Sequence, residues 1–212
     1  MFKPLSSVVA TALVLAASHA SAVTLTFEEF AAGTVLSNQY AGSGALFSAN
    51  TFTGPGSSTS GAAWATNTDM TIVSSIGADV GGLGSPPLVS GNILRSFAGW
   101  LAEDGDPSFR ISFTTPVSSF SAAFAGVSTA ADVTLYAYDG ASLLGTVSGA
   151  STGQFVLSFA ASSITAVAIR PGSFNDWVGV DNITFAPVPE PGSYALMAMG
   201  MGLLALRLRR QR

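Results

Sequence analysis

The chain lacks cysteine, and its 212 residues include one histidine and one lysine. Both of these, His19 and Lys3, precede residue 23. The rest of the sequence therefore excludes Ser-His-Asp and Cys-His nucleophile systems, zinc sites built from histidine or cysteine, lysine Schiff bases and the P-loop lysine. Carboxylate chemistry and oxygen-liganded metals such as calcium remain available. Because no disulfide reinforces the fold, packing alone must hold it together.

Charge is scarce as well. Charged residues make up 9% of the chain, against about 25% in an average domain. Residues 23–187 contain three basic and eleven acidic side chains, a net charge of −8. An acidic domain without a basic patch argues against nucleic acid and against anionic lipid as partners. We therefore expect no binding to nucleic acid.

The N-terminus has the pattern of an export signal. Lys3 supplies a positive charge, residues 8–17 are almost all apolar, and Ala20-Ser21-Ala22 is a small-residue cleavage site. The apolar run is shorter than the roughly 20 residues that cross a membrane. A buried core helix is the alternative interpretation, but the order of the three parts favours export. We predict a signal helix over residues 1–22, with cleavage between Ala22 and Val23.

The C-terminus is apolar again and ends in arginines. Val188-Pro189-Glu190-Pro191 is followed by an uncharged stretch rich in Gly, Ala, Leu and Met, and residues 207–212 carry four arginines. As a helix, residues 192–208 come close to a full membrane span. The positive-inside rule places the basic end, residues 207–212, in the cytoplasm. We predict a short transmembrane helix over residues 192–208, with the body of the protein outside the inner membrane.

The three parts of this tail, residues 188–212, resemble a PEP-CTERM sorting signal. In that family the tail holds an exported protein in the inner membrane, and the membrane protease exosortase is taken to act at the Pro-Glu-Pro. The resemblance implies Pro189, Glu190 and Pro191 as the sorting motif and exosortase as a partner. It also implies a link to exopolysaccharide and biofilm, and a final location at the cell surface or in the extracellular matrix. A simple C-terminal membrane anchor is the alternative.

The body, residues 23–187, has the length of one domain. Its dominant period is two, which predicts strands with one buried face. Alternating apolar positions include Leu25 and Phe27, Phe109 to Phe113, Phe120 to Phe124, Val133 to Ala137, Phe155 to Phe159, and Trp177 to Phe185. Asp139-Gly140 between two apolar runs predicts a hairpin. We predict an all-β, antiparallel β-sandwich of jelly-roll type with roughly eight to ten strands.

Two short segments resemble the opening and closing strands of exported jelly-roll domains found with such tails. They are Thr26-Phe27-Glu28-Glu29-Phe30 and residues 178–185. Glu29 and Asp181 have the parity of the buried face, where a carboxylate needs a partner. In one interpretation they share a structural calcium ion, which related jelly-rolls often carry, with backbone carbonyls as further ligands. In the other they bond loop amides or reach solvent at the strand ends.

Aromatic side chains are the candidates for glycan contact. Tyr136 and Tyr138 have the parity of the polar face, and Trp100 is a further ring that could stack on a sugar. The acidic cluster Glu103-Asp104-Gly105-Asp106 resembles half of a calcium loop, with a solvated turn as the alternative. Core packing and cross-strand pairing are the alternative roles. We predict no catalytic residue and no enzymatic activity, and polysaccharide is a further candidate partner. A carbohydrate-binding module is the second interpretation, and a glycan-active hydrolase, which needs two carboxylates across a cleft, is the third.

Overall fold

The computed structural model describes residues 21–49, 70–76, 85–95, 109–171, 178–188, 199–201 and 207. Ser21–Val188 forms one compact unit, and the residues before and after it group separately. In the described part of the chain, no helix is both long and apolar enough to cross a membrane. The signal segment 1–20 and most of the predicted span 192–208 lie outside the described residues.

The described body contains nine strands, and every pairing among them is antiparallel. This confirms the predicted all-β class. The strands are β1 (Val23–Leu25), β2 (Ala45–Ala49), β3 (Ile72–Ser74), β4 (Asn92–Arg95), β5 (Phe109–Val127), β6 (Val133–Asp139), β7 (Ser142–Ser148), β8 (Gly153–Pro171) and β9 (Gly179–Pro187). The predicted hairpin is also present, since Asp139-Gly140 joins β6 to β7 and Gly140 has a φ of 59°.

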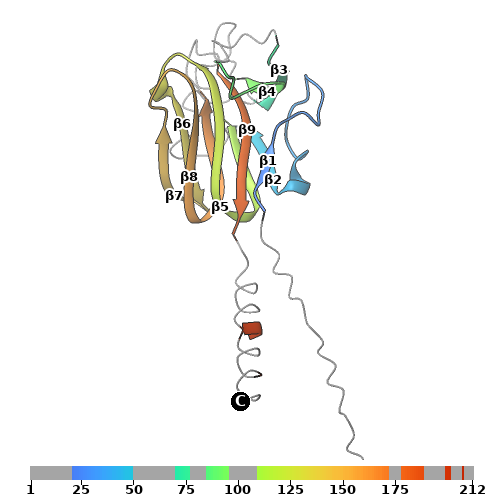
Figure 1. The fold of residues 1–212 in the computed structure, drawn as a ribbon, viewed down its shortest axis with the longest axis vertical. Coiled ribbons are helices and arrows are strands. Elements are labelled where there is room, and N and C mark those ends of the chain that lie inside the picture. Colours follow the sequence, from blue (N-terminus) through green and yellow to red (C-terminus); the bar gives the residue numbers. More distant parts are fainter. Residues whose placement is uncertain are drawn as a thin grey trace, which may run out of the picture. The chain divides into compact units, whose positions relative to one another are not determined.

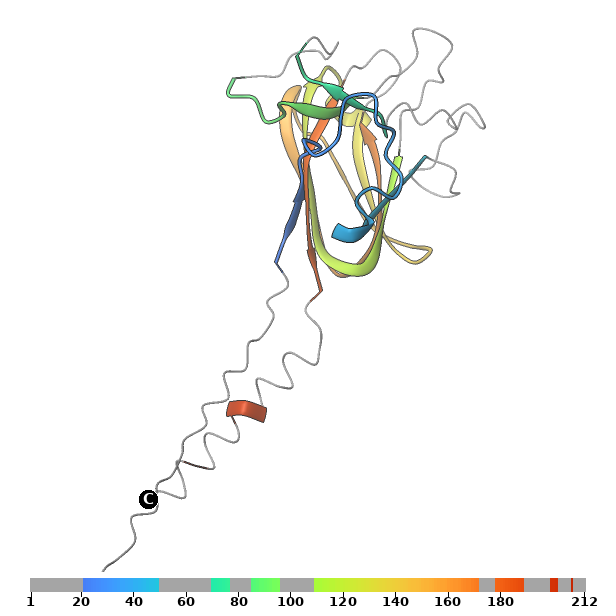
Figure 2. The same cartoon turned by 90° about the vertical axis from the view of Figure 1, so that its right-hand side faces the viewer.

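Two long strands, β5 and β8, connect the layers of the sandwich. Each has 19 residues. They pair with each other from end to end, and the largest of three register shifts lies between Ser112 and Val117. The strands bend there, so each contributes one half to each layer (Figures 1 and 2). One layer contains β2, the first half of β5, the second half of β8, β6 and β7. The other contains β3, β4, β9, the remaining halves of β5 and β8, and β1 on β9.

The core lies between these two layers and is rich in phenylalanine. Phe113 and Phe185 approach with ring centroids 5.0 Å apart, which joins the two layers. The largest fully buried side chains are Phe27, Phe109, Phe120, Phe124 and Phe185. Each such ring contributes roughly 1.5–3 kcal/mol by leaving water. This packing accounts for a fold without disulfides.

Candidate functional site

The last strand, β9, carries a β-bulge near its start. Along β5 and β9, Ser121 pairs with Thr184 but Ala123 pairs with Asp181, so β9 contains one extra residue. Asn182 has a φ of 51°, the left-handed conformation that bulges of this kind require. The bulge resets the alternation of side chains. As a result Val180 and Ile183 both face the core, whereas Asp181 faces outward beside Ala123.

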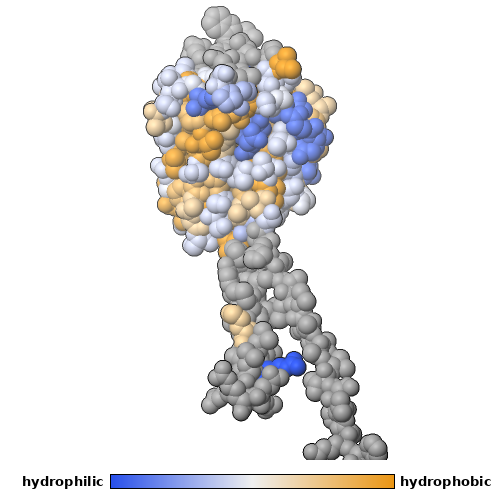
Figure 3. Space-filling model, viewed as in Figure 1, coloured by the Kyte–Doolittle hydropathy of each residue, from blue (hydrophilic) through white to orange (hydrophobic). Residues whose placement is uncertain are grey.

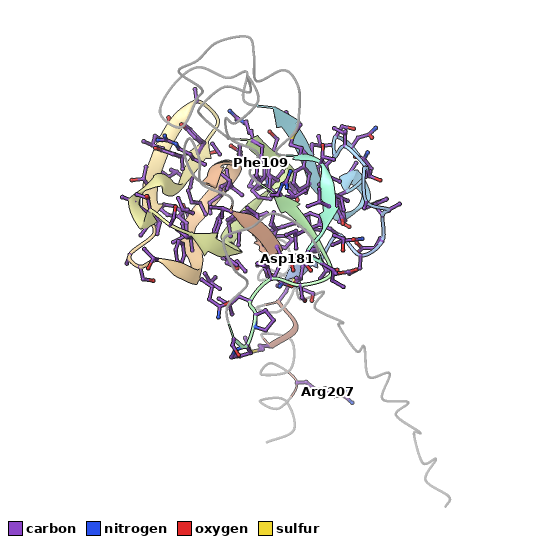
Figure 4. All side chains as sticks on the ribbon, turned by 90° about the horizontal axis from the view of Figure 1, so that it is seen from above. Phe109, Asp181 and Arg207 are labelled. Atoms are coloured by element: carbon purple, nitrogen blue, oxygen red, sulfur yellow. The ribbon has the colours of Figure 1, made fainter. Side chains whose placement is uncertain are left out.

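Asp181 is nevertheless buried, because the segment 85–91 covers it. The side chain is 2% exposed and lies on β9 (Figure 4). The covering segment contributes Val89, which packs with Ile93 of β4, Ala123 and Ala125 in a small cluster outside the main core. The carboxylate therefore lies in a second apolar layer on the outer face of the sheet, not between the two sheets.

Backbone and side-chain N–H groups surround the Asp181 carboxylate. Oδ1 accepts from the backbone N–H of Asn182 at 2.6 Å. Oδ2 accepts from the backbone N–H of Ser90 at 3.2 Å and from Nδ2 of Asn182 at 3.3 Å. These donors suit a carboxylate and partly offset the cost of burying it.

Two amide side chains hold the covering segment in place. Gln154 of β8 accepts from the Leu88 N–H with Oε1 and donates from Nε2 to the Pro86 carbonyl, both at 2.8 Å. Nδ2 of Asn182 also donates to the Leu88 carbonyl at 2.9 Å. The segment is therefore fixed by residues of β8 and β9, which are distant in sequence.

The acidic residue that acts on Asp181 is Glu28, not Glu29. Oε1 of Glu28 accepts from the backbone N–H of Asn92 at 2.8 Å, next to the covering segment. Gly91 has a φ of 66°, and a Cβ there would overlap the Glu28 carboxylate. Burial raises the pKa of Asp181 to about 6; the Asn182 and Ser90 N–H groups oppose this rise and the negative charge of Glu28 adds to it.

The prediction that Glu29 shares the buried face is wrong. Strand β1 ends at Leu25, and Phe27 has a φ of 63°, so the alternation stops before Glu29. Glu29 is exposed, and its Oε2 accepts from the hydroxyl of Tyr40 at 2.9 Å. Burial raises the pKa of Tyr40, and the bond to Glu29 raises it further.

Calcium at Asp181 stays a prediction. Among the described residues, no group of three or more His, Cys, Asp or Glu side chains is placed to hold a metal. The Leu88 carbonyl is close by, since Nδ2 of Asn182 donates both to it and to Asp181, and Glu28 acts on Asp181 through its charge. Calcium takes six to eight oxygens, whereas both Asp181 oxygens already accept N–H donors. The observed arrangement is that of a hydrogen-bond acceptor.

The tyrosines of β6 lie on the outer face, as the alternation predicts. Leu135 and Ala137 join the main core, and Tyr136 and Tyr138 form a separate cluster with Ala166 and Ala168. Tyr138 is only 4% exposed, and the guanidinium of Arg110 stands 5.7 Å from its ring centroid. Tyr136 is half-buried and is the more accessible ring. Trp100 lies outside the described residues.

Both predicted processing points adjoin the same end of the body. Val23 begins β1 and pairs with Phe185 near the end of β9, so cleavage after Ala22 would leave β1 whole. Beyond β9, the Val188 N–H donates to the Pro116 carbonyl at 3.1 Å. Pro189, Glu190 and Pro191 follow at once and lie outside the described residues.

Comparison with known proteins identifies the tail. Residues 187–211 match the family model of the PEP-CTERM protein-sorting motif. The chain is thus an exported protein with an exosortase sorting signal, and exosortase is its processing partner. No curated protein matches the chain.

Two solved structures are similar to the chain at 13% identity. The K2 cleaved adhesin domain of Lys-gingipain aligns over 78% of this chain and 99% of its own, with a TM-score of 0.46. The K3 cleaved adhesin domain of Lys-gingipain from Porphyromonas gingivalis w83 aligns over 46% and 72%, with a TM-score of 0.28. Similarity at this level carries no information on what this chain binds.

Sequence reasoning found Asp181 but missed Glu28, Ser90, Asn182 and Gln154. Ser90 and Gln154 reach the site through tertiary contacts, and no local pattern marks them. Asn182 did carry a signal, because asparagine is among the few residues that tolerate a left-handed backbone.

Proposed function

We propose that this protein is a non-catalytic component of the cell envelope or extracellular matrix, associated with exopolysaccharide and biofilm. The observation that carries the proposal is the sorting motif at residues 187–211, which begins where β9 ends. A tail of this kind gives the protein an address outside the cytoplasm and a means of release from the inner membrane. The precursor is anchored there with its body outside the cytoplasm.

The chemistry of the body supports a non-catalytic role. Its sequence from Val23 to Pro187 offers no histidine, cysteine or lysine. Asp181, whose pKa burial raises, lies beneath the segment 85–91 and is bonded to backbone N–H groups. A glycosidase needs two carboxylates that face a sugar across a cleft, and Asp181 is not presented in that way.

Cell fractionation tests the proposed location. Antibody to the body should detect the protein in the matrix that washing or shearing removes from cells. Deletion of exosortase should move the protein into the membrane fraction, because the tail then stays attached. Wild-type protein found only in the cytoplasm would contradict the proposal, and a cytoplasmic enzyme marker controls for lysis.

Carbohydrate binding is the second candidate, favoured by the half-buried Tyr136 next to the Arg110–Tyr138 pair on the outer face of β6 and β5. An aromatic ring presents a flat apolar surface with a polar edge. If this surface binds sugar, the purified body should be retained by polysaccharide from the same cells. Tyr136→Ala should abolish retention and Tyr136→Phe should keep it. Equal retention of all three proteins would reject Tyr136 as the contact.

A further inference from the structure

Among the residues that the structure describes, one lateral side of the sandwich has open strand edges. In the first layer, β7 has β6 as its only partner strand in the described body. In the described part of the second layer, the first half of β8 pairs with β5 alone. The two edges are neighbours, since a Cβ on Gly145 of β7 would stand 2.8 Å from the ring of Phe159 of β8.

The opposite lateral side is closed. The N–H groups of Ala45 and Phe47 in β2 donate to the carbonyls of Tyr40 and Ser37, at 3.1 and 2.7 Å. In the other layer, the Ile72 N–H of β3 donates to the Thr34 carbonyl at 2.8 Å. Strands β1 and β3 have only three residues each. The segment 33–40 and short strands thus protect these edges, as is usual in β-proteins.

The open side has little such protection. Residues 140–169 contain no charged residue and no proline, although charges and prolines are the common means of blocking an edge. One bulge, between Ala137 and Tyr138 in the β6–β7 pairing, interrupts β7. The pairing of β5 with β8 is regular from Phe155 to Ala160.

Apolar side chains accompany these edges. Leu143 and Leu144 of β7 are 41% and 40% exposed, and Val156 of β8 is 53% exposed. In Figure 3 the largest apolar area lies over the half of the body where Figure 1 labels β6, β7 and β8.

We propose that this open side, formed by β7 and the first half of β8, binds the same side of a second copy of the chain. Charge favours a second copy as the occupant. The body carries a net charge of −8, which opposes self-association elsewhere on its surface, but the uncharged edges meet without repulsion. Because the opposite side is closed, the open side of one copy contacts the open side of the other. Such an isologous contact ends at a dimer and does not grow into a filament.

The size of the side sets the strength of the dimer. A seven-residue edge is about 23 Å long, and the two layers are about 10 Å apart. Including its side chains, this face of the body then buries roughly 500 Å² of surface per copy. The total of roughly 1,000 Å² is at the lower end of the areas of specific interfaces. The dimer is therefore weak in solution. Copies held in one membrane by their tails meet at a higher effective concentration.

Sedimentation of the body, Ser21–Val188, tests the proposal, because this unit contains its own core. Concentrations from roughly 1 μM to 1 mM cover the range of weak interfaces, and the wild type should shift from monomer to dimer. The double variant Leu144→Lys with Val156→Lys should weaken the dimer by roughly a hundredfold, because like charges then face each other. Ile76→Lys, at an 89% exposed position beyond β3, is the matched control and should dimerise normally.

Cross-linking provides a second measurement that does not depend on the stability of the lysine variants. The chain has no cysteine, so a single introduced cysteine reports on one position. Ser158→Cys on β8 should form cross-linked dimers with a short bis-maleimide, and Ile76→Cys should not. A body that stays monomeric throughout would overturn the proposal. Dimers that tolerate both lysines, or that cross-link equally through residue 76, would overturn the assigned surface.

Discussion

Cells that produce Glu190→Gln protein are expected to retain it in the membrane as an uncleaved precursor. The substitution keeps the size of the side chain and removes its charge between two prolines. A site built to bind a specific polar group rejects its analogue strongly, so release should fall by roughly a hundredfold. Immunoblots of membrane and culture fractions measure the ratio of precursor to released protein.

The folded body ends close to the motif in the sequence. Only Val188, which is bonded to Pro116, separates the end of β9 from Pro189. If exosortase acts at Pro-Glu-Pro, we expect it to bind the motif directly beside a folded domain. Ser193→Ala, just beyond the motif, is the control and should be released normally. Release of Glu190→Gln at the wild-type rate would contradict processing at Pro-Glu-Pro and favour a simple anchor.

Strands with a clear period of two, such as β6, were predictable because alternation is a local property. In β6, Leu135 and Ala137 face the main core and Tyr136 and Tyr138 face outward, as the sequence suggests. The turn at Asp139-Gly140 follows from the two residues alone. The register of β5 with β8 was not predictable in the same way. The bend after Ser112 turns one long strand into parts of two layers, and it depends on contacts between distant segments.

The candidate site shows where the alternation argument fails. A single residue in the left-handed region shifts the parity of everything beyond it, and this occurs at Phe27 and again at Asn182. Glu29 was therefore assigned to the wrong face. Asp181 was correctly expected to be buried, but it lies beneath the segment 85–91 instead of inside the core. That segment is held by Gln154 and Asn182, contacts that no local pattern encodes.

Asp181→Ala is expected to destabilise the body most in mild acid. With its pKa raised to about 6 in the folded state, above the unfolded value of about 3.9, Asp181 binds its proton more tightly when folded. The contribution of Asp181 to the free energy of unfolding is complete below about pH 4. It is lost as pH rises through about 6, a change of up to about 3 kcal/mol. In the alanine variant, residue 181 contributes no pH dependence to the free energy of unfolding. Its buried N–H donors are left without an acceptor, at a cost of about 1–3 kcal/mol.

Thermal melts of both proteins between pH 4 and pH 8, with and without chelator, measure this difference. A change of 3 kcal/mol corresponds to roughly 6–12 °C in a body of this size. Asp139 is exposed in the hairpin turn, so Asp139→Ala is the control. Its melting temperature should change with pH as that of the wild type does.

A bound calcium ion would reverse the sign of the result. The ion requires the ionised carboxylate, so wild-type stability would rise with pH and a hundredfold excess of calcium over its Kd would add about 2.7 kcal/mol. Chelator would then lower the melting temperature of the wild type at pH 8 and leave Asp181→Ala unchanged. Because N–H donors already surround both Asp181 oxygens, we expect the melting temperature to be insensitive to chelator. The advantage of aspartate over alanine should then shrink between pH 4 and pH 8, and an advantage that grows with pH would reject the acceptor role in favour of the ion.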